Sequence, residues 1–476
     1  MYKKLLSQTI IYGIGAILPR IILFILNPLL INQIENKDFA IFTNLYALIS
    51  FVNIVLSFGF ETAFFRFSSQ QENEKKTFNT SFWFLFAMSG IFLFFCILFN
   101  QPIANLLGYE NNPEYILWFA LIAFFDNLCV IPFAWLRFHN MPIKYSAVRV
   151  VQSVFQAIFT AVLLLYIPQN IPQSFGLTEK VSYPFFSNLA ASFLGFALLS
   201  PILLKVRFSF DIALFKKMIK YSVPLMIAGL AFMVNENFDK FIQIYLIPNE
   251  EAGAYGGVYK LAVLMTLFVT AYRMGIEPFF FKQMDKGDAK NTYAKITEYF
   301  TFFAAIVAMG IIANISWLKH LLIPNSSYWI AIDIIPIIVL ANLFFGIYYN
   351  FSTWYKVTDR TEVGTFISWV GAIINIVFNY IVLYYYQSFI GSAWVTFASY
   401  FVMMLISYFL GQKYYPIPYR IKKMALLLII LFAFSYITVV LSHYNFWVGN
   451  ALFLLYLGIV VYSEKDLLLS KIKKLK

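Results

Sequence analysis

The sequence contains fourteen long apolar segments separated by short polar stretches. About 20 predominantly apolar residues are enough for an α-helix to cross the hydrocarbon core of a bilayer. The composition agrees, because 61% of the 476 residues are hydrophobic and only 12% are charged, whereas soluble domains carry about 25% charged residues. We therefore predict an all-α polytopic membrane protein. The expected spans lie at residues 5–31, 39–60, 82–100, 115–136, 146–167, 183–204, 218–247, 252–281, 296–317, 328–355, 363–386, 390–411, 424–441 and 446–462.

The basic residues follow these spans in a one-sided pattern. With a cytoplasmic N-terminus, most of the 35 Lys and Arg residues fall in inner loops, and the outer loops hold only Lys37, Lys180 and Lys319. Short loops rich in Lys and Arg remain in the cytoplasm. We therefore expect both termini to be cytoplasmic, in a bacterial inner (cytoplasmic) membrane. The net charge of +12 then reflects topology, and no nucleic-acid partner is expected.

The sequence offers little for catalysis. Cys96 and Cys129 lie inside apolar segments and give neither a metal-ligand spacing nor a disulfide framework, so no metal or other cofactor is predicted. A membrane polymerase or glycosyltransferase would need catalytic residues in a substantial outer loop. The longest outer loops, 100–114 and 168–182, contain few charged side chains, and we predict that the protein is not an enzyme.

Two motifs occur twice in the chain, in the same order. Gly59–Arg66 and Gly275–Lys282 share a Gly, a Glu, a Phe-Phe pair and a closing base, and Trp135–Arg137 is matched by Trp354–Lys356. Chance similarity between apolar helices is the alternative explanation. Because six spans separate the copies, both have the same orientation, as in parallel repeats that place the substrate path between two lobes. We expect lobes at residues 1–204 and 205–411, followed by two additional helices and a basic cytoplasmic tail at 412–476.

Each copy of the longer motif contains its own acid and its own base. Glu61 precedes Arg66, and Glu277 precedes Lys282. We predict a local salt bridge within each pair, at the cytoplasmic end of its span.

Polar side chains form stripes along three of the predicted spans. A charged residue at the centre of a span costs roughly 2.5–3.5 kcal/mol on insertion scales, so it is expected to face a cavity or a partner. Small and hydroxyl side chains on such a stripe can instead serve helix packing, but this explanation suits an arginine poorly. We expect a polar cavity lined by Arg20, Asn27, Asn53, Tyr255, Tyr259, Thr266, Thr270 and Arg273.

Other charged residues inside spans have two open interpretations. Glu236 and Lys240 stand four residues apart and can neutralise each other on one helix face. Asp126 is either the partner of a basic residue or a relay for protons or cations. The candidates for ion coupling or for structural ion pairs are Asp126, Glu236, Asp239, Lys240 and Lys260.

Three further motifs complete the pattern, namely Asn237–Lys240, Glu251–Gly256 and Asn375–Tyr380. Together with the length, the fourteen spans and the repeat, they resemble the O-antigen-type polysaccharide flippases of the multidrug/oligosaccharidyl-lipid/polysaccharide exporter superfamily. The resemblance covers essentially the whole chain. It implies a V-shaped pair of lobes, alternating access and a cationic central cavity, to which Arg20 and Arg273 correspond in position.

The resemblance also implies a substrate. This is a polyprenyl-diphosphate-linked oligosaccharide that moves from the cytoplasmic to the periplasmic leaflet for the synthesis of a surface polysaccharide such as lipopolysaccharide. The implied partners are this lipid-linked substrate and the bilayer, with a polysaccharide polymerase and chain-length proteins as further candidates.

Three alternatives remain open. A drug/cation antiporter of the same superfamily would need an acid-dominated cavity, whereas Arg20 and Arg273 favour an anionic substrate. A lipid II flippase for peptidoglycan synthesis has nearly the same requirements as an oligosaccharide flippase, so the sequence separates these two only weakly. A membrane polysaccharide polymerase is a more distant alternative.

Overall fold

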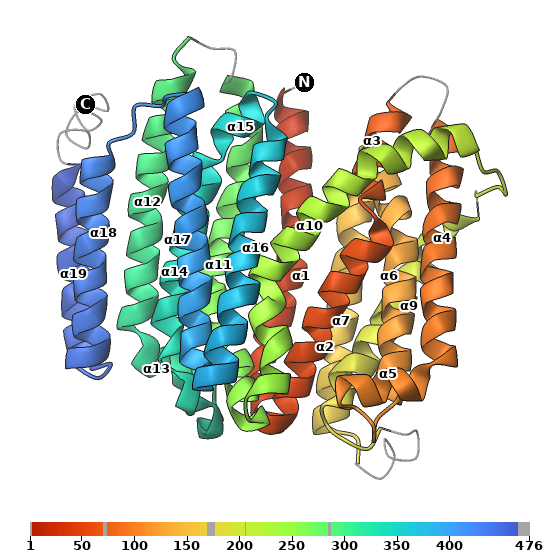
Figure 1. Cartoon of the computed structure of the whole chain (residues 1–476), viewed down its shortest axis with the longest axis horizontal. Helices are drawn as coiled ribbons and strands as arrows, with labels where there is room; N and C mark the ends of the chain where they lie inside the picture. The colour runs from red at the N-terminus through yellow and green to blue at the C-terminus, as the bar shows by residue number, and fades with distance from the viewer. Residues whose placement is uncertain (1, 70–73, 169–176, 205, 284–286, 465–476) are drawn as a thin grey trace. The chain divides into compact units, whose positions relative to one another are not determined.

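The computed structural model describes residues 2–69, 74–168, 177–204, 206–283 and 287–464. Within these ranges the regular elements are all helices, and 14 of them are long and apolar enough to cross a membrane, which confirms the predicted fold class (Figure 1). The helices are α1 (Tyr2–Gln33), α2 (Asn36–Ser57), α3 (Phe60–Ser68), α4 (Glu74–Leu98), α5 (Asn100–Leu107), α6 (Glu114–Phe138), α7 (Pro142–Leu165), α9 (Ser182–Leu203), α10 (Ile212–Leu246), α11 (Asn249–Gln283), α12 (Ala289–Ala313), α13 (Ile315–Leu322), the 3-10 helix η1 (Ser326–Ala331), α14 (Ile334–Phe351), α15 (Thr353–Val357), α16 (Thr361–Tyr386), α17 (Phe389–Tyr414), α18 (Ile421–Tyr436), the π-helix η2 (Ile437–Leu441) and α19 (Phe446–Ser463).

The second predicted span, 39–60, is longer in the structure and is interrupted. α2 and α3 together form one membrane-length segment, and between them Phe58 and Gly59 adopt left-handed backbone conformations with φ of 52° and 69°. A side chain at Gly59 would lie 3.1 Å from the carbonyl oxygen of Ser222 on α10. Glycine therefore permits both the left-handed turn and the close approach of α10.

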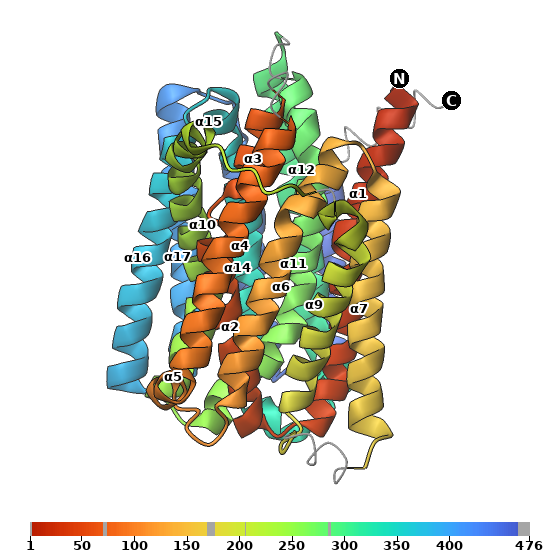
Figure 2. The same ribbon diagram turned by 90° about the vertical axis from the view of Figure 1, so that its right-hand side faces the viewer.

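Helix contacts divide the chain into two compact units, Met1–Ile244 and Tyr245–Lys476. In the first unit, α6 packs against α2, α4 and α9, and α1 packs along α7. Figure 2 shows α4, α6 and α9 side by side. A cluster that contains Phe60 and Phe64 joins α3 to Met218 of α10. These contacts group most of α10 with the first unit, whereas the sequence placed this helix at the start of the second lobe.

α14 is the core of the second unit. Every residue from Ile334 to Phe351 is buried, and the helix packs against α11, α12 and α17. Burial on all sides explains why nearly the whole circumference of this helix is apolar. α18 and α19 pack on α12 at the edge of this unit (Figure 1), so the two additional helices that follow the predicted repeat belong to the second unit.

Each unit contains one copy of each repeated motif, and an ion pair joins the two motifs. Glu61 pairs with Arg137 in the first unit. Glu277 pairs with Lys356 in the second unit, with 3.2 Å between Oε1 and Nζ. The two pairs therefore join the positions that the sequence repeat aligns.

The partner of Glu61 corrects the first of the two predicted local salt bridges. Glu61 does not pair with Arg66, because residues five apart point to different sides of a helix. The Arg66 guanidinium carbon instead lies 4.3 Å from the centroid of the Tyr221 ring. The second predicted bridge, Glu277 with Lys282, stays a prediction, because the side chain of Lys282 lies outside the described residues. Glu277 does pair with the distant Lys356.

Candidate functional site

Arg273 lies on α11 within a cluster of charged and aromatic side chains. Its guanidinium carbon lies 5.2 Å from the centroid of the Tyr349 ring on α14, and Lys356 Nζ lies 3.8 Å from the same centroid. Lys356 is also the ion-pair partner of Glu277, one turn after Arg273 on α11. The cluster thus places two cations and one carboxylate around a single ring. A guanidinium held over a ring can still direct its edge N–H groups at oxygen ligands.

The other candidates on α11 pack inside the second unit. Tyr255 and Tyr259 are buried, with exposed fractions of 0% and 7%, and their ring centroids are 5.9 Å apart. Thr266 Oγ1 donates to Asn342 Oδ1 on α14 at 3.1 Å, and Thr270 is half-buried. Their role in lining a cavity stays a prediction.

Three candidates lie in the first unit. Arg20 is exposed on α1 and Asn27, further along the same helix, is half-buried. An exposed arginine within an apolar span requires water or a polar partner. Asn53 on α2 is half-buried, and its Oδ1 is buried without a hydrogen-bond partner in the described part of the chain. These side chains are therefore suited to polar ligands, and their role also stays a prediction.

Asp126 on α6 belongs to a polar cluster of the first unit. It forms a hydrogen bond with Ser192 on α9, and the charge of Arg149 on α7 acts on it. The Arg149 guanidinium carbon lies 3.9 Å from the centroid of the Phe133 ring. Arg149 is thus the basic side chain whose charge acts on Asp126, and ion relay at this residue stays a prediction.

Further polar side chains from α2, α7 and α9 join this cluster. Tyr46 on α2 forms hydrogen bonds with Asn188 on α9 and Gln156 on α7, and the charge of Asp126 reaches Tyr46. Sequence reasoning missed the cluster because four helices supply it and because Arg149 was assigned to an inner loop. A signal was present, since Arg149 and Gln156 are seven residues apart and lie on one face of α7.

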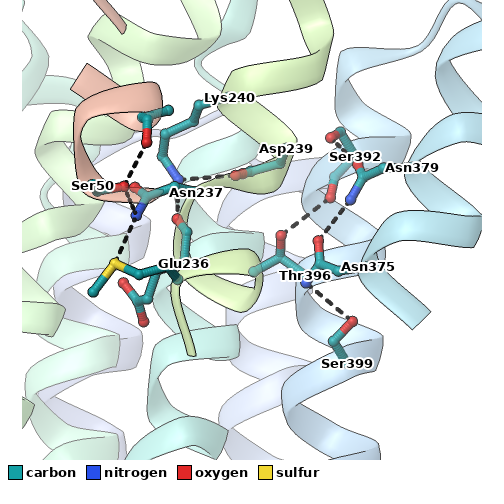
Figure 3. Close-up of polar contacts among 12 residues, drawn as sticks. Ser50, Glu236, Asn237, Asp239, Lys240, Asn375, Asn379, Ser392, Thr396 and Ser399 are labelled. Atoms are coloured by element: carbon teal, nitrogen blue, oxygen red, sulfur yellow. Dashed lines mark hydrogen bonds and ion pairs between the residues drawn. The ribbon is translucent and has the colours of Figure 1, made fainter. Parts of the chain in front are cut away.

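The polar motif of α10 forms a compact network (Figure 3). Lys240 Nζ donates to Asp239 Oδ1 at 3.0 Å and to the main-chain carbonyl of Glu236 at 2.6 Å. Asn237 Nδ2 donates to Ser50 Oγ on α2 at 3.1 Å. The sequence predicted Glu236 as the partner of Lys240, and the structure adds the adjacent, buried Asp239 as a carboxylate partner.

A second network, without charged groups, joins α16 to α17 (Figure 3). Asn379 Nδ2 donates to Asn375 Oδ1 at 2.7 Å, and Asn375 Nδ2 donates to Ser399 Oγ at 3.3 Å. Ser392 Oγ donates to Asn379 Oδ1, and Thr396 Oγ1 donates to the Ser392 carbonyl at 3.4 Å. All five side chains are buried. Sequence reasoning noted Asn375–Tyr380 only as a motif, because Ser392 and Ser399 lie on another helix.

Two other expectations concern single residues and metals. Lys260 is half-buried on α11, and its part in ion coupling stays a prediction. Throughout the described ranges, no three His, Cys, Asp or Glu side chains gather as a metal site would require.

Comparisons with known proteins identify the family. A model of the family described as "Polysaccharide biosynthesis protein" matches residues 5–284, more than half of the chain. The chain belongs to the polysaccharide biosynthesis protein family. A second family model, MatE, matches residues 224–381. Its fold is that of transporters of the multidrug/oligosaccharidyl-lipid/polysaccharide exporter superfamily.

Solved transporters share the fold of this polysaccharide biosynthesis protein. The lipid II flippase MurJ in an inward closed conformation is 17% identical over 96% of this chain and 100% of its own, with a TM-score of 0.75. A mutant of the Vibrio cholerae MATE transporter VcmN is 13% identical over 86% and 96%, with a TM-score of 0.61. An inward-facing multidrug resistance MATE transporter is 11% identical over 88% and 95%, with a TM-score of 0.66. The search of curated proteins gave no match.

The charged clusters of this polysaccharide biosynthesis protein differ in their balance. Asp239 pairs with Lys240, and the charge of Arg149 acts on Asp126. The Arg273 cluster contains two basic side chains, Arg273 and Lys356, and one carboxylate, Glu277. Lys356 pairs with this carboxylate. The Arg273 cluster therefore carries a surplus of positive charge.

Proposed function

We propose that this transporter flips a polyprenyl-diphosphate-linked oligosaccharide from the cytoplasmic to the periplasmic leaflet of a bacterial inner membrane, for surface polysaccharide synthesis. In this proposal both termini are cytoplasmic and two lobes give alternating access to the substrate. Membership of the polysaccharide biosynthesis protein family supports the pathway. Alternating access is supported by MATE transporters of the same fold, which have been solved in inward-facing and outward-facing conformations.

The observation that carries the proposal is the surplus charge of the Arg273 cluster. A charge within a span is costly, and here Lys356 takes up the nearby carboxylate of Glu277. Arg273 is held over the Tyr349 ring and is suited to an anion. A guanidinium can bind two phosphate oxygens at once, so a diphosphate is a fitting ligand.

The chemistry of the substrate explains why a transporter is needed. A diphosphate and several sugars cannot cross about 30 Å of hydrocarbon unaided, because each polar group would lose its hydrogen bonds. The polyprenyl chain, in contrast, is soluble in lipid. The protein must therefore provide a polar path for the head group, and Arg20, Asn27, Asn53 and Thr270 are half-buried or exposed side chains that can contribute to it.

Deletion of the gene tests the proposal. We expect the surface glycan to disappear while its lipid-linked repeat unit accumulates in the cytoplasmic leaflet, and a plasmid copy should reverse both effects. The two leaflets are distinguished by the access of a sugar-modifying enzyme to right-side-out and inverted vesicles. Loss of the glycan with no lipid-linked precursor would indicate a defect in synthesis and would contradict a flippase.

A second candidate is the flipping of lipid II, because the MurJ structure matches this chain over 96% of its length. Expression during depletion of the resident lipid II flippase separates the two. Rescue of growth would favour lipid II, whereas failure to rescue together with loss of a surface glycan on deletion would favour the oligosaccharide. A cation antiporter is disfavoured by the positive charge of the Arg273 cluster.

A further inference from the structure

The first unit contains a cavity of about 930 Å³ where α4 begins and α6 ends. Its lining includes three basic side chains, Lys75, Lys76 and Arg207, beside the aromatic rings of Trp135 and Phe208. These residues belong to none of the three charged clusters described above. The cavity therefore calls for its own explanation.

One wall of the cavity is a segment of residues 206–211 that is fixed to α4 by hydrogen bonds. The Arg207 N–H donates to Asn79 Oδ1 and the Asp211 N–H donates to Thr80 Oγ1, both at 3.2 Å. Trp83 Nε1 donates to the Arg207 carbonyl at 3.0 Å. Because Asn79 and Thr80 are buried, the wall is preformed, and Arg207 is held at the cavity by its own backbone.

The charged side chains that line the cavity have a net positive charge. The carboxylate of Glu74 is engaged on the wall, since Glu74 Oε1 accepts from Trp135 Nε1 at 3.1 Å and lies 3.3 Å from His139 Nε2. Lys75, Lys76 and Arg207 are exposed. Three cations against one engaged carboxylate favour an anionic ligand, and phosphate suits both ammonium and guanidinium groups.

The rim of the same cavity is apolar. Leu204 and Phe208 both line it, and their exposed fractions are 85% and 87%. The Phe208 ring is braced by Trp83, with 5.1 Å between the ring centroids. Large apolar side chains this exposed, beside a group of bases, suit a ligand with a phosphate at one end and a hydrocarbon chain at the other.

We propose that this cavity binds the phosphate head group of an anionic phospholipid of the cytoplasmic leaflet. The basic residues hold the phosphate, and the acyl chains lie over Leu204 and Phe208. In the orientation predicted from the basic loops, the cavity opens at the inner interface, where such head groups lie, and basic pockets between helices on that side bind anionic lipids. The site is separate from the proposed transport of oligosaccharide.

Native mass spectrometry of the purified full chain tests the site, with phosphatidylglycerol and phosphatidylcholine as probes. In the triple variant Lys75→Gln, Lys76→Gln, Arg207→Gln we expect retention of phosphatidylglycerol to fall more than about ten-fold, because one hydrogen bond from a charged group to the phosphate contributes roughly ten-fold or more. The matched control is the triple variant Lys216→Gln, Lys217→Gln, Lys220→Gln, which removes the same charge from exposed positions of α10 and should change retention less than about two-fold.

Two further arms identify the source of the phosphate. Phe208→Ser should weaken the binding of phosphatidylglycerol although all three basic side chains remain. Inorganic phosphate at millimolar concentration should not displace the lipid. Equal losses in both triple variants would show diffuse attraction and would overturn the site, and so would full displacement by inorganic phosphate. If the cavity variant stops glycan export but retains phosphatidylglycerol, the cavity belongs to the transport route, which would overturn this inference and leave the proposed function standing.

Discussion

Substitution of Arg273 is the most direct test of an anionic substrate. The guanidinium lies 5.2 Å from the Tyr349 centroid, while Lys356 is occupied by Glu277 at 3.2 Å. In Arg273→Ala the cluster therefore loses its surplus cation, and what remains is a neutral ion pair beside a ring. The expected result is a large loss of substrate binding.

The magnitude follows from the interaction that is removed. A hydrogen bond to a charged group contributes about 1.5–3 kcal/mol, which corresponds to roughly 10- to 150-fold in affinity. Arg273→Lys retains a point charge but not the two-pronged geometry, so an intermediate loss is expected. The cation–π contact with Tyr349 contributes about 0.5–2 kcal/mol, which is small enough for the alanine variant to remain folded.

The assay is flipping of purified lipid-linked oligosaccharide in proteoliposomes, with the half-saturating concentration as the readout. Arg360→Ala is the matched control, because the Arg360 guanidinium carbon also lies over a tyrosine, 4.9 Å from the Tyr414 centroid, but the side chain is exposed before α16. The Arg360→Ala variant should flip the substrate with a normal half-saturating concentration. An alanine variant of Arg273 with normal half-saturation would refute the reasoning. So would a degraded alanine variant accompanied by a fully normal lysine variant, since that combination indicates a structural role.

Three other predictions concern topology, the Asp126 cluster and the α16–α17 network. Reporter fusions after Lys76 should be cytoplasmic and those at Ser326 periplasmic, and reversal of either would disprove the predicted orientation. Asp126→Asn should reduce flipping because it removes the carboxylate on which the charge of Arg149 acts. Recovery in the double variant with Arg149→Gln would indicate that the two charges have a structural role, whereas a persistent defect with altered dependence on the pH gradient would indicate ion relay. Asn379→Leu breaks two buried side-chain hydrogen bonds and should cost about 1–2 kcal/mol, seen as a lower Tm in detergent; an unchanged Tm would contradict this.

The membrane fold could be predicted from the sequence because its main determinant is local. Each span must be apolar over about 20 residues to lie in lipid, and this can be read without knowing any neighbour. The extension of the second span to Ser68 could not be read in this way. It depends on a left-handed turn at Phe58 and Gly59 and on Ser222 of α10, which comes close to Gly59 only in the folded chain.

The charged pairs were harder to predict because their partners are distant in sequence. Glu61 was assigned to Arg66 because it is near, yet helix geometry separates these two and brings Arg137 from α6 instead. The surplus charge at Arg273 was expected from its place in a span, whereas the Tyr349 ring that positions it comes from α14. The sequence therefore identified the charged residues within spans, but not the side chains from other helices that contact them.

The matched pairs Glu61–Arg137 and Glu277–Lys356 bear on how such a chain could arise. Each half contains its own acid on one helix and its own base two spans later. Duplication of a gene for one half would therefore copy both members of the ion pair. An even number of spans returns the second copy to the same side of the membrane as the first. An ancestor of half the length could thus have worked as a parallel dimer, and fusion of the two genes would have required no inversion of either half. The two pairs differ only in the base, which is Arg137 in one half and Lys356 in the other.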